Sequence, residues 1–146
     1  MIKKLDHAAI TVTDMEQALT FYRDKLGLKV VMDTEMGGEH FDMLFGCPGI
    51  RGRAVYFAEG LELLQFFSPA DGKPLNQKFW DIGAALFVVE VDDLEATYST
   101  LVDRGVEFYS PVVSPPTHIP TVGQIKLAHV RAPEGVRISL FEKPRP

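Results

Sequence analysis

The sequence predicts an α+β fold in which a unit of one strand, one helix and several further strands occurs twice. Three observations predict it. Residues 5–12 alternate as in a strand, residues 14–26 follow a helical pattern, and strand-like stretches come after them. The same order of elements returns over 86–144. The chain has 146 residues, 46% of them hydrophobic and 24% charged, which is enough for a globular domain with its own core.

The first copy begins with a strand over 5–12 and a helix over 14–26. Asp14 precedes the helix as an N-cap residue, and Gly27 suits the left-handed conformation that ends it. Apolar side chains recur on one face of this helix: Met15, Leu19, Tyr22 and Leu26. Three stretches rich in β-branched and aromatic residues are then expected to be strands: 29–35, 53–58 and 61–67.

The second copy repeats these signals. LFVVEVDD at 86–93 matches HAAITVTD at 7–14 position for position, and both end in aspartate. The expected helix over 93–104 again closes on a glycine, Gly105. Three strands are expected after it: 105–113, 124–132 and 136–144. Any α+β protein has helices between its strands. Here the helix caps, the glycines that end the helices and the ends of the strands also match, which indicates a duplicated unit.

The duplication divides the chain into two modules and a connection. We expect module one over 1–70, a linker over 71–81 and module two over 82–146, together forming one domain. The connecting stretch, SPADGKPLNQKFWDIG, contains the proline, glycine and aspartate residues that are typical of loops.

Composition excludes several classes of function. The net charge of −5, without a Lys/Arg cluster, argues against a nucleic-acid partner. No apolar stretch reaches the ~18 residues of a membrane span, and the N-terminal stretch lacks the apolar run of a signal peptide. The single cysteine, Cys47, excludes an internal disulfide framework and fits a reducing compartment. We therefore expect a cytoplasmic protein with no membrane partner.

The repeated unit resembles the vicinal oxygen chelate (VOC) superfamily, which includes glyoxalase I, epimerases, extradiol dioxygenases and bleomycin and fosfomycin resistance proteins. Its most specific parts are DHAAITVTDMEQALTFYRDKLGLKVV and the pairing of GVEFYSPVV with RAPEGVRISLFE. The resemblance covers nearly the whole chain. It implies two tandem βαβββ modules that form a curled mixed sheet around a cleft, a small-molecule substrate or ligand, and a homodimer.

The resemblance also implies positions for a metal. VOC members with glyoxalase-like chemistry take one ligand from the first and last strands of each module. Those positions fall on His7 and Glu62 in module one, and on Leu86 and Ser139 in module two. Leucine cannot coordinate a metal, and a serine hydroxyl is a poor ligand for a divalent ion. We therefore expect no metal or other cofactor, with a weakly bound divalent ion at His7 and Glu62 as the alternative.

The alternation of side chains along each strand predicts which other residues face the cleft. We expect catalytic roles for His7, Glu62 and His129, the last because a tyrosine occupies the matching turn position in extradiol dioxygenases. Six further side chains are expected to contact the substrate: Tyr56, Phe66, Leu86, Arg137, Ser139 and Phe141. The alternatives are that His7 is a packed core histidine, and that a one-residue shift in register leaves Glu62 in solvent.

Three functions stay open. The first is a glyoxalase-like lyase, isomerase or epimerase that abstracts a proton beside a carbonyl and stabilises the enolate. Glu62 would be the base, because a carboxylate in a mostly apolar cleft is more basic, while His7 and His129 would polarise the carbonyl or move the proton. The second is a non-catalytic small-molecule binding protein of the antibiotic-resistance type. The third, a metal-dependent dioxygenase, is disfavoured by Leu86 and Ser139.

Overall fold

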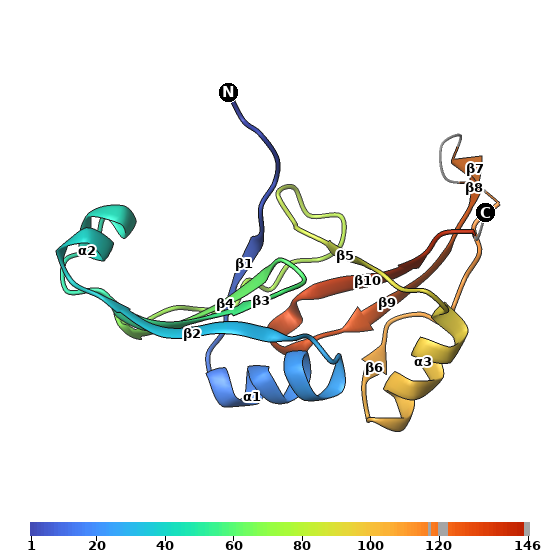
Figure 1. Ribbon diagram of the computed structural model, residues 1–146, viewed down its shortest axis with the longest axis horizontal. Helices are drawn as coiled ribbons and strands as arrows, with labels where there is room; N and C mark the ends of the chain where they lie inside the picture. Colours follow the sequence, from blue (N-terminus) through green and yellow to red (C-terminus); the bar gives the residue numbers. More distant parts are fainter. Residues whose placement is uncertain (117, 120–122, 145–146) are drawn as a thin grey trace. The chain divides into compact units, whose positions relative to one another are not determined.

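Two compact units, Met1–Lys73 and Pro74–Pro146, make up the chain (Figure 1). The structure is a computed structural model that describes residues 1–116, 118–119 and 123–144. Each unit is an α+β module with one four-stranded mixed sheet, so the predicted fold class of two βαβββ-like modules is confirmed. No helix in the described part of the chain is long and apolar enough to cross a membrane.

The sheet of the first unit has the strand order β1-β4-β3-β2. Its first strand runs parallel to its last, and the other neighbours are antiparallel. The strands are β1 Ala8–Thr11, β2 Val30–Gly37, β3 Arg51–Phe57 and β4 Leu61–Ser68. The helices are α1 Met15–Leu19, its π-helical continuation η1 Thr20–Lys25, and α2 Glu39–Phe45. The predicted helix over 14–26 is therefore present, with a change of helix type after its first five residues.

The second unit repeats this plan with the strand order β5-β10-β9-β6, in which β5 and β10 are parallel. Its main elements are β5 Phe87–Glu90, α3 Leu94–Asp103, β6 Glu107–Phe108, β9 Lys126–Arg131 and β10 Arg137–Glu142. A small hairpin of β7 His118–Ile119 and β8 Gly123–Gln124 precedes β9, and a 3₁₀ turn, η2 Pro133–Gly135, follows it.

The strand predicted over 105–113 is mostly irregular. Only Glu107–Phe108 form a strand, and a separate bridge joins Val113 to Leu127 of β9. Pro111 lies between these two paired parts. Proline has no N–H to donate to a neighbouring strand, so a continuous ladder through this position is disfavoured.

A side chain from the last strand of the first unit secures the start of its helix. Asp14 caps α1 by accepting a hydrogen bond from the Gln17 N–H at 3.0 Å. Gln65 of β4 accepts another from the Met15 N–H at 3.0 Å and donates its own amide to the Thr13 carbonyl at 3.0 Å. Two of the N–H groups that a helix start leaves unpaired are thereby satisfied.

The second unit contains the same junction. Asp93 caps α3 by accepting from the Ala96 N–H at 2.9 Å, and Glu142 of β10 accepts from the Leu94 N–H at 2.6 Å. The last strand again reaches the first residue of the helix. This agreement in atomic detail supports the duplication that the sequence pattern predicts.

In each unit the apolar core lies on one face of the sheet, between the sheet and the helix that follows its first strand, α1 or α3. In the first unit the buried core includes Ile10, Met15, Leu19, Tyr22, Val55, Phe57 and Leu63. In the second it includes Leu94, Leu101, Ala128, Val130, Ile138 and Leu140. Because neighbouring residues of a strand point to opposite faces, the residues between these core positions lie on the other face.

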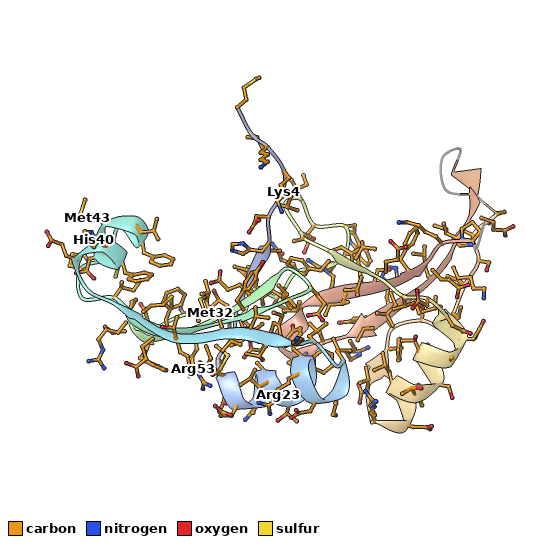
Figure 2. All side chains as sticks on the ribbon, in the orientation of Figure 1. Lys4, Arg23, Met32, His40, Met43 and Arg53 are labelled. Carbon is orange, nitrogen blue, oxygen red and sulfur yellow. The ribbon has the colours of Figure 1, made fainter. Side chains whose placement is uncertain are left out.

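Arg53 of β3 adds a polar connection on the helix side of the first sheet. Its guanidinium lies 2.6 Å from the Glu16 carboxylate of α1 and 2.8 Å from the Asp33 carboxylate of β2. Figure 2 shows the Arg53 side chain between the strands and the helix. Arg53 therefore joins β2, β3 and α1 on this face.

The junction at Gln65 generates a prediction. Replacing Gln65 with alanine leaves the N–H of the fully buried Met15 without its acceptor, so we expect a loss of about 1–3 kcal/mol in the free energy of unfolding. Chemical denaturation measures this loss. Gln17→Ala is the matched control, because only the main chain of Gln17 takes part in the cap, and its effect should stay within about 0.5 kcal/mol. Equal effects of the two substitutions would contradict the role of the Gln65 side chain.

Candidate functional site

His7 and Glu62 are brought together by the parallel pairing of β1 and β4. Ala8 lies opposite Leu61 and Ala9 opposite Glu62, and His7 shares a sheet face with Ala9, so His7 and Glu62 are diagonal neighbours on that face. His7 Nε2 is 3.3 Å from Glu62 Oε2. The two side chains are 38% and 19% exposed, so the pair lies at the surface and is not packed beneath a helix. The register places Glu62 on the face opposite the core residue Leu63.

Tyr56 completes this group from a third strand. It lies directly opposite Glu62 in the antiparallel pairing of β3 with β4. Its ring meets the His7 imidazole edge to face, with 5.2 Å between the ring centres. Three of the predicted site residues therefore form one cluster, which we call the His7 cluster. Their roles in binding or catalysis stay predictions.

Asp6 is a member of this neighbourhood that the sequence reasoning missed. Its Oδ2 lies 3.0 Å from His7 Nδ1, so the imidazole stands between two carboxylates. The hydrogen bond to Asp6 is the main cause that raises the pKa of His7. Loss of solvent around the ring opposes it, and the charge of Glu62 adds to the increase. The same bond, together with Lys4, lowers the pKa of Asp6. The charged imidazolium is therefore favoured.

Phe66 lies elsewhere on the face that carries Glu62. It is four residues further along β4, and its ring packs edge to face on Phe45 of α2 at 5.4 Å. Figure 2 shows α2, with His40 and Met43 labelled, at the end of the first unit away from β1. Phe66 therefore supports α2, and the structure records no contact between its ring and the His7 cluster.

In the second unit Arg137 is buried, with 6% of its surface exposed. Its guanidinium donates to the Ala85 carbonyl at 3.2 Å and to the Gln77 carbonyl at 2.8 Å, and lies 5.3 Å from the centre of the Phe79 ring. The donors that we expected to face a substrate carboxylate are thus taken by two residues that precede β5, Gln77 and Ala85.

His129 and Ser139 lie opposite each other on β9 and β10, on the same face as Arg137. The His129 ring is 5.1 Å from Phe79, whose other neighbour is Tyr109 at 5.3 Å. Ser139 is 1% exposed, and its hydroxyl has no hydrogen-bond partner among the described residues. The sequence reasoning missed Gln77, Phe79 and Tyr109, since they belong to irregular segments and no periodic pattern marks them.

Leu86 and Phe141 border this second group. Leu86 is largely exposed just before β5, and Phe141 is half-buried two residues after Ser139 on β10. Lys143 Nζ lies 6.0 Å from the centre of the Phe141 ring, at the outer limit of a cation–π contact. Both residues are apolar, and their place in the wall of a binding site stays a prediction.

A metal with the four ligand positions of the resemblance does not fit these residues. His7 and Glu62 supply two donors, whereas Leu86 has none and Ser139 has only a hydroxyl. Among the described residues, no three His, Cys, Asp or Glu side chains lie close enough together to hold an ion. Metal centres in enzymes normally take three or more protein ligands of these types. We therefore derive no step through a metal.

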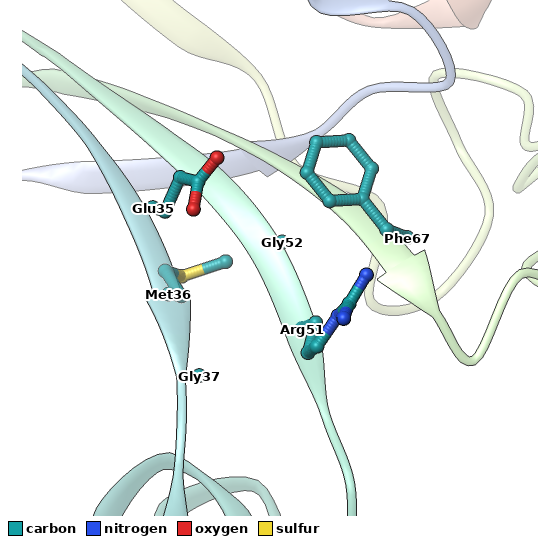
Figure 3. A pocket seen from close by; sticks show the side chains of 6 residues that line it. All are labelled: Glu35, Met36, Gly37, Arg51, Gly52 and Phe67. Atoms are coloured by element: carbon teal, nitrogen blue, oxygen red, sulfur yellow. The ribbon is translucent and has the colours of Figure 1, made fainter.

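A separate cavity of about 360 Å³ lies in the first unit where β2, β3 and β4 run side by side (Figure 3). Its walls are Glu35, Met36, Gly37, Arg51, Gly52 and Phe67. None of the predicted site residues lines it. A Cβ on Gly52 would lie 2.3 Å from the Gln65 carbonyl oxygen, so only glycine allows the close approach of β3 and β4 here.

Comparisons with known proteins support one family. The profile described as "Glyoxalase/Bleomycin resistance protein/Dioxygenase superfamily" matches residues 4–140. A glyoxalase family protein from Bacillus cereus is similar in structure, with 21% identity, a TM-score of 0.77, and coverage of 99% of this chain and 97% of that chain. No curated protein matches the sequence.

Two further solved structures share the fold. A glyoxalase family protein from Enterococcus faecalis has 18% identity, a TM-score of 0.67, and coverage of 96% of this chain and 98% of that chain. A trypanothione-dependent glyoxalase I from Leishmania major has 17% identity, a TM-score of 0.62, and coverage of 97% and 87%.

The two carboxylates beside His7 predict that the pKa of its imidazole is raised in the folded protein. We expect the His7 ring to titrate above the ordinary histidine pKa in an NMR titration, and Asp6→Asn to remove most of that increase. Glu62→Gln should remove less. Because the folded pKa is raised, protonated His7 stabilises the fold fully below the unfolded-state pKa, and this contribution is lost as pH rises through the folded value. The reference is His7 itself in the protein unfolded by denaturant, and an equal midpoint in the folded and unfolded protein would contradict the expectation.

The missing second pair of ligands predicts weak metal binding. Protein purified without chelator should contain well under one equivalent of zinc, nickel, manganese or iron by elemental analysis, because two ligands leave most of the coordination shell to water. Any metal that is found should fall further in Glu62→Gln and stay unchanged in Glu39→Gln, an exposed glutamate of α2. One equivalent of metal that survives dialysis would contradict this expectation.

Proposed function

Because the chain belongs to the Glyoxalase/Bleomycin resistance protein/Dioxygenase superfamily, we propose that it is a lyase, isomerase or epimerase that removes a proton beside the carbonyl of a small molecule. The observation that carries the proposal is the His7–Glu62 pair, with 3.3 Å between Nε2 and Oε2. Such a pair combines a proton acceptor and a proton donor within reach of one substrate.

Glu62 is the proposed base. A bound substrate gives the proton of the carbon next to its carbonyl to the Glu62 carboxylate, and the electron pair of that C–H bond moves onto the carbonyl oxygen. Glu62 is mostly covered, which reduces competition from water for its oxygens. Return of the proton to carbon gives isomerisation or epimerisation, and loss of a leaving group gives elimination.

His7 and Tyr56 are the proposed donors to the developing oxyanion. The raised pKa of His7 keeps the imidazolium populated, and its Nε2–H lies beside the base. The Tyr56 hydroxyl belongs to the ring that packs on His7. Donors placed where negative charge develops stabilise the transition state more than the substrate. Asp6 is the residue that positions His7, through its bond to Nδ1.

A non-catalytic binding protein is the second candidate. It is favoured by the residues at the second pair of family positions, since Leu86 and Ser139 carry no acid–base group. A ligand would then lie against the same His7 cluster without losing a proton. The two candidates differ in one measurable respect, the exchange of substrate hydrogen with solvent.

Solvent exchange tests the proposal. In D₂O, the protein should catalyse deuterium incorporation next to the carbonyl of at least one member of a panel of small ketones, 2-oxo acids and thioesters, followed by proton NMR. Glu62→Gln and His7→Ala should each lower the exchange rate by ~10²–10⁴ with the fold intact by circular dichroism, because each removes a general acid–base group.

Matched controls come from the neighbouring pair on α2. Glu39→Gln and His40→Ala change the same residue types at exposed positions outside the His7 cluster, so they should exchange at the wild-type rate. Binding of a panel compound without any exchange would favour the binding protein. Exchange that is unaffected by both His7→Ala and Glu62→Gln would refute the assigned roles.

A further inference from the structure

We propose that the second unit binds an aromatic carboxylate at Arg137, and that residues 74–85, which we call the strap, occupy this site until such an acid displaces them. The proposal concerns contacts within the second unit and does not depend on the proton transfer proposed for the first. Figure 1 shows the strap as an irregular segment that leads into β5. It is longer than most connections between elements, which average about 4–6 residues.

The buried charge of Arg137 is the first argument. Only 6% of the residue is exposed, yet none of the ion pairs formed by the described residues includes it. A charge taken out of water is costly unless an opposite charge and hydrogen bonds compensate it. Neutral carbonyl groups supply the hydrogen bonds here, but no anion does. A ligand anion would supply the missing charge.

The oxygens that Arg137 contacts indicate the shape of that anion. The Gln77 carbonyl oxygen lies 2.8 Å from Nη1, and the Gln77 side-chain Oε1 lies 3.5 Å from Nη2. Two oxygens that face the two terminal nitrogens resemble the fork in which arginine holds a carboxylate. Gln77 thus occupies the place of a carboxylate without its charge.

The Phe79 ring indicates what the carboxylate is attached to. The ring is bounded by the Arg137 guanidinium at 5.3 Å, the His129 ring at 5.1 Å and the Tyr109 ring at 5.3 Å. These three planar groups form a slot that accepts one aromatic ring. A ligand that carries its carboxylate next to an aromatic ring would replace Gln77 and Phe79 together.

Ser139 provides an independent indication of a ligand. Its hydroxyl is buried without a hydrogen-bond partner among the described residues, on the face that it shares with Arg137 and His129. Leaving a buried hydroxyl unpaired costs about 1–3 kcal/mol, so such groups normally have a partner. A carboxylate oxygen held by Arg137 is a suitable acceptor for this hydroxyl.

The strap is built to be displaced. Three of its large apolar side chains, Leu75, Trp80 and Ile82, are largely exposed, and Phe79 is itself 39% exposed, so the strap buries little apolar surface. Its other hydrogen bonds are local, such as those between Lys78 and Asp81. Few favourable contacts are therefore lost when the strap moves.

Trp80 is the only tryptophan of the chain and reports on the strap directly. Titration with benzoate should give a saturable change in tryptophan fluorescence, and isothermal calorimetry on the same protein should give the same dissociation constant. Benzamide, which has the same shape without the charge, should bind roughly tenfold or more weakly, because charge-assisted hydrogen bonds are about twice as strong as neutral ones. Acetate, which lacks the ring, should also bind more weakly.

Substitutions separate displacement from simple contact. Phe79→Ala should tighten benzoate binding several-fold, since the ring that competes for the slot is gone. Arg137→Lys should weaken it by roughly tenfold or more, because lysine cannot form the fork. Phe67→Ala is the matched control, as Phe67 is 44% and Phe79 39% exposed. Phe67 lines the first-unit cavity beside Arg51, so weaker benzoate binding in this variant would place the site there and overturn the proposal.

Three further results would overturn the proposal. The first is that benzoate binds neither the wild type nor Phe79→Ala at concentrations up to its solubility. The second is that benzoate and benzamide bind with equal affinity. The third is that benzoate binds Phe79→Ala more weakly than it binds the wild type. If circular dichroism shows that Arg137→Lys is unfolded, the affinities of folded Phe79→Ala for benzoate and benzamide are compared instead. Equal affinities in that variant would overturn the proposal. All of these experiments measure binding of benzoate or its analogues. Their outcome is therefore independent of the hydrogen-exchange test of the first unit.

Discussion

The parallel pairing of the first and last strands within each unit is the constraint on which the rest of the structure depends. β1 lies beside β4, and β5 beside β10, so the segment that enters the helix runs next to the end of the last strand. Gln65 and Glu142 can reach the first helical residue only because of this pairing. Each junction satisfies main-chain N–H groups that would otherwise be buried without a partner.

The same register places the candidate chemistry, and the two units use it differently. In the first unit the residues at equivalent strand positions are His7 and Glu62, which form an ion pair. In the second they are Leu86 and Ser139, which cannot exchange protons near neutral pH. The backbone of the duplicated unit is kept while the side chains differ. A shared fold therefore says where a site lies, and the residues decide what it does.

Local patterns predicted most of the fold, whereas the resemblance to the VOC superfamily singled out His7 and Glu62. Caps, helix periodicity and strand alternation depend on neighbouring residues, so the start of α1 and the face of Glu62 could be read from the sequence. Pro111 shortens the strand expected over 105–113, a local signal that the strand prediction passed over. The contacts of Gln77 and Phe79 with Arg137 span more than fifty residues and arise from an irregular segment, for which no periodic signal exists.

The electrostatics of the two units favour different ligand groups. His7 lies between the carboxylates of Asp6 and Glu62, and Lys4 lies 3.4 Å from Asp6, so the charges of the first-unit cluster are already paired with one another. Arg137 has hydrogen bonds but no counterion among the described residues, so its surroundings attract one. A neutral carbonyl group suits the first environment. The imidazolium can donate a hydrogen bond to the carbonyl oxygen, while a carboxylate accepts the proton from the neighbouring carbon. A carboxylate suits the second, where it adds the charge that the neutral oxygens of Gln77 and Ala85 cannot supply.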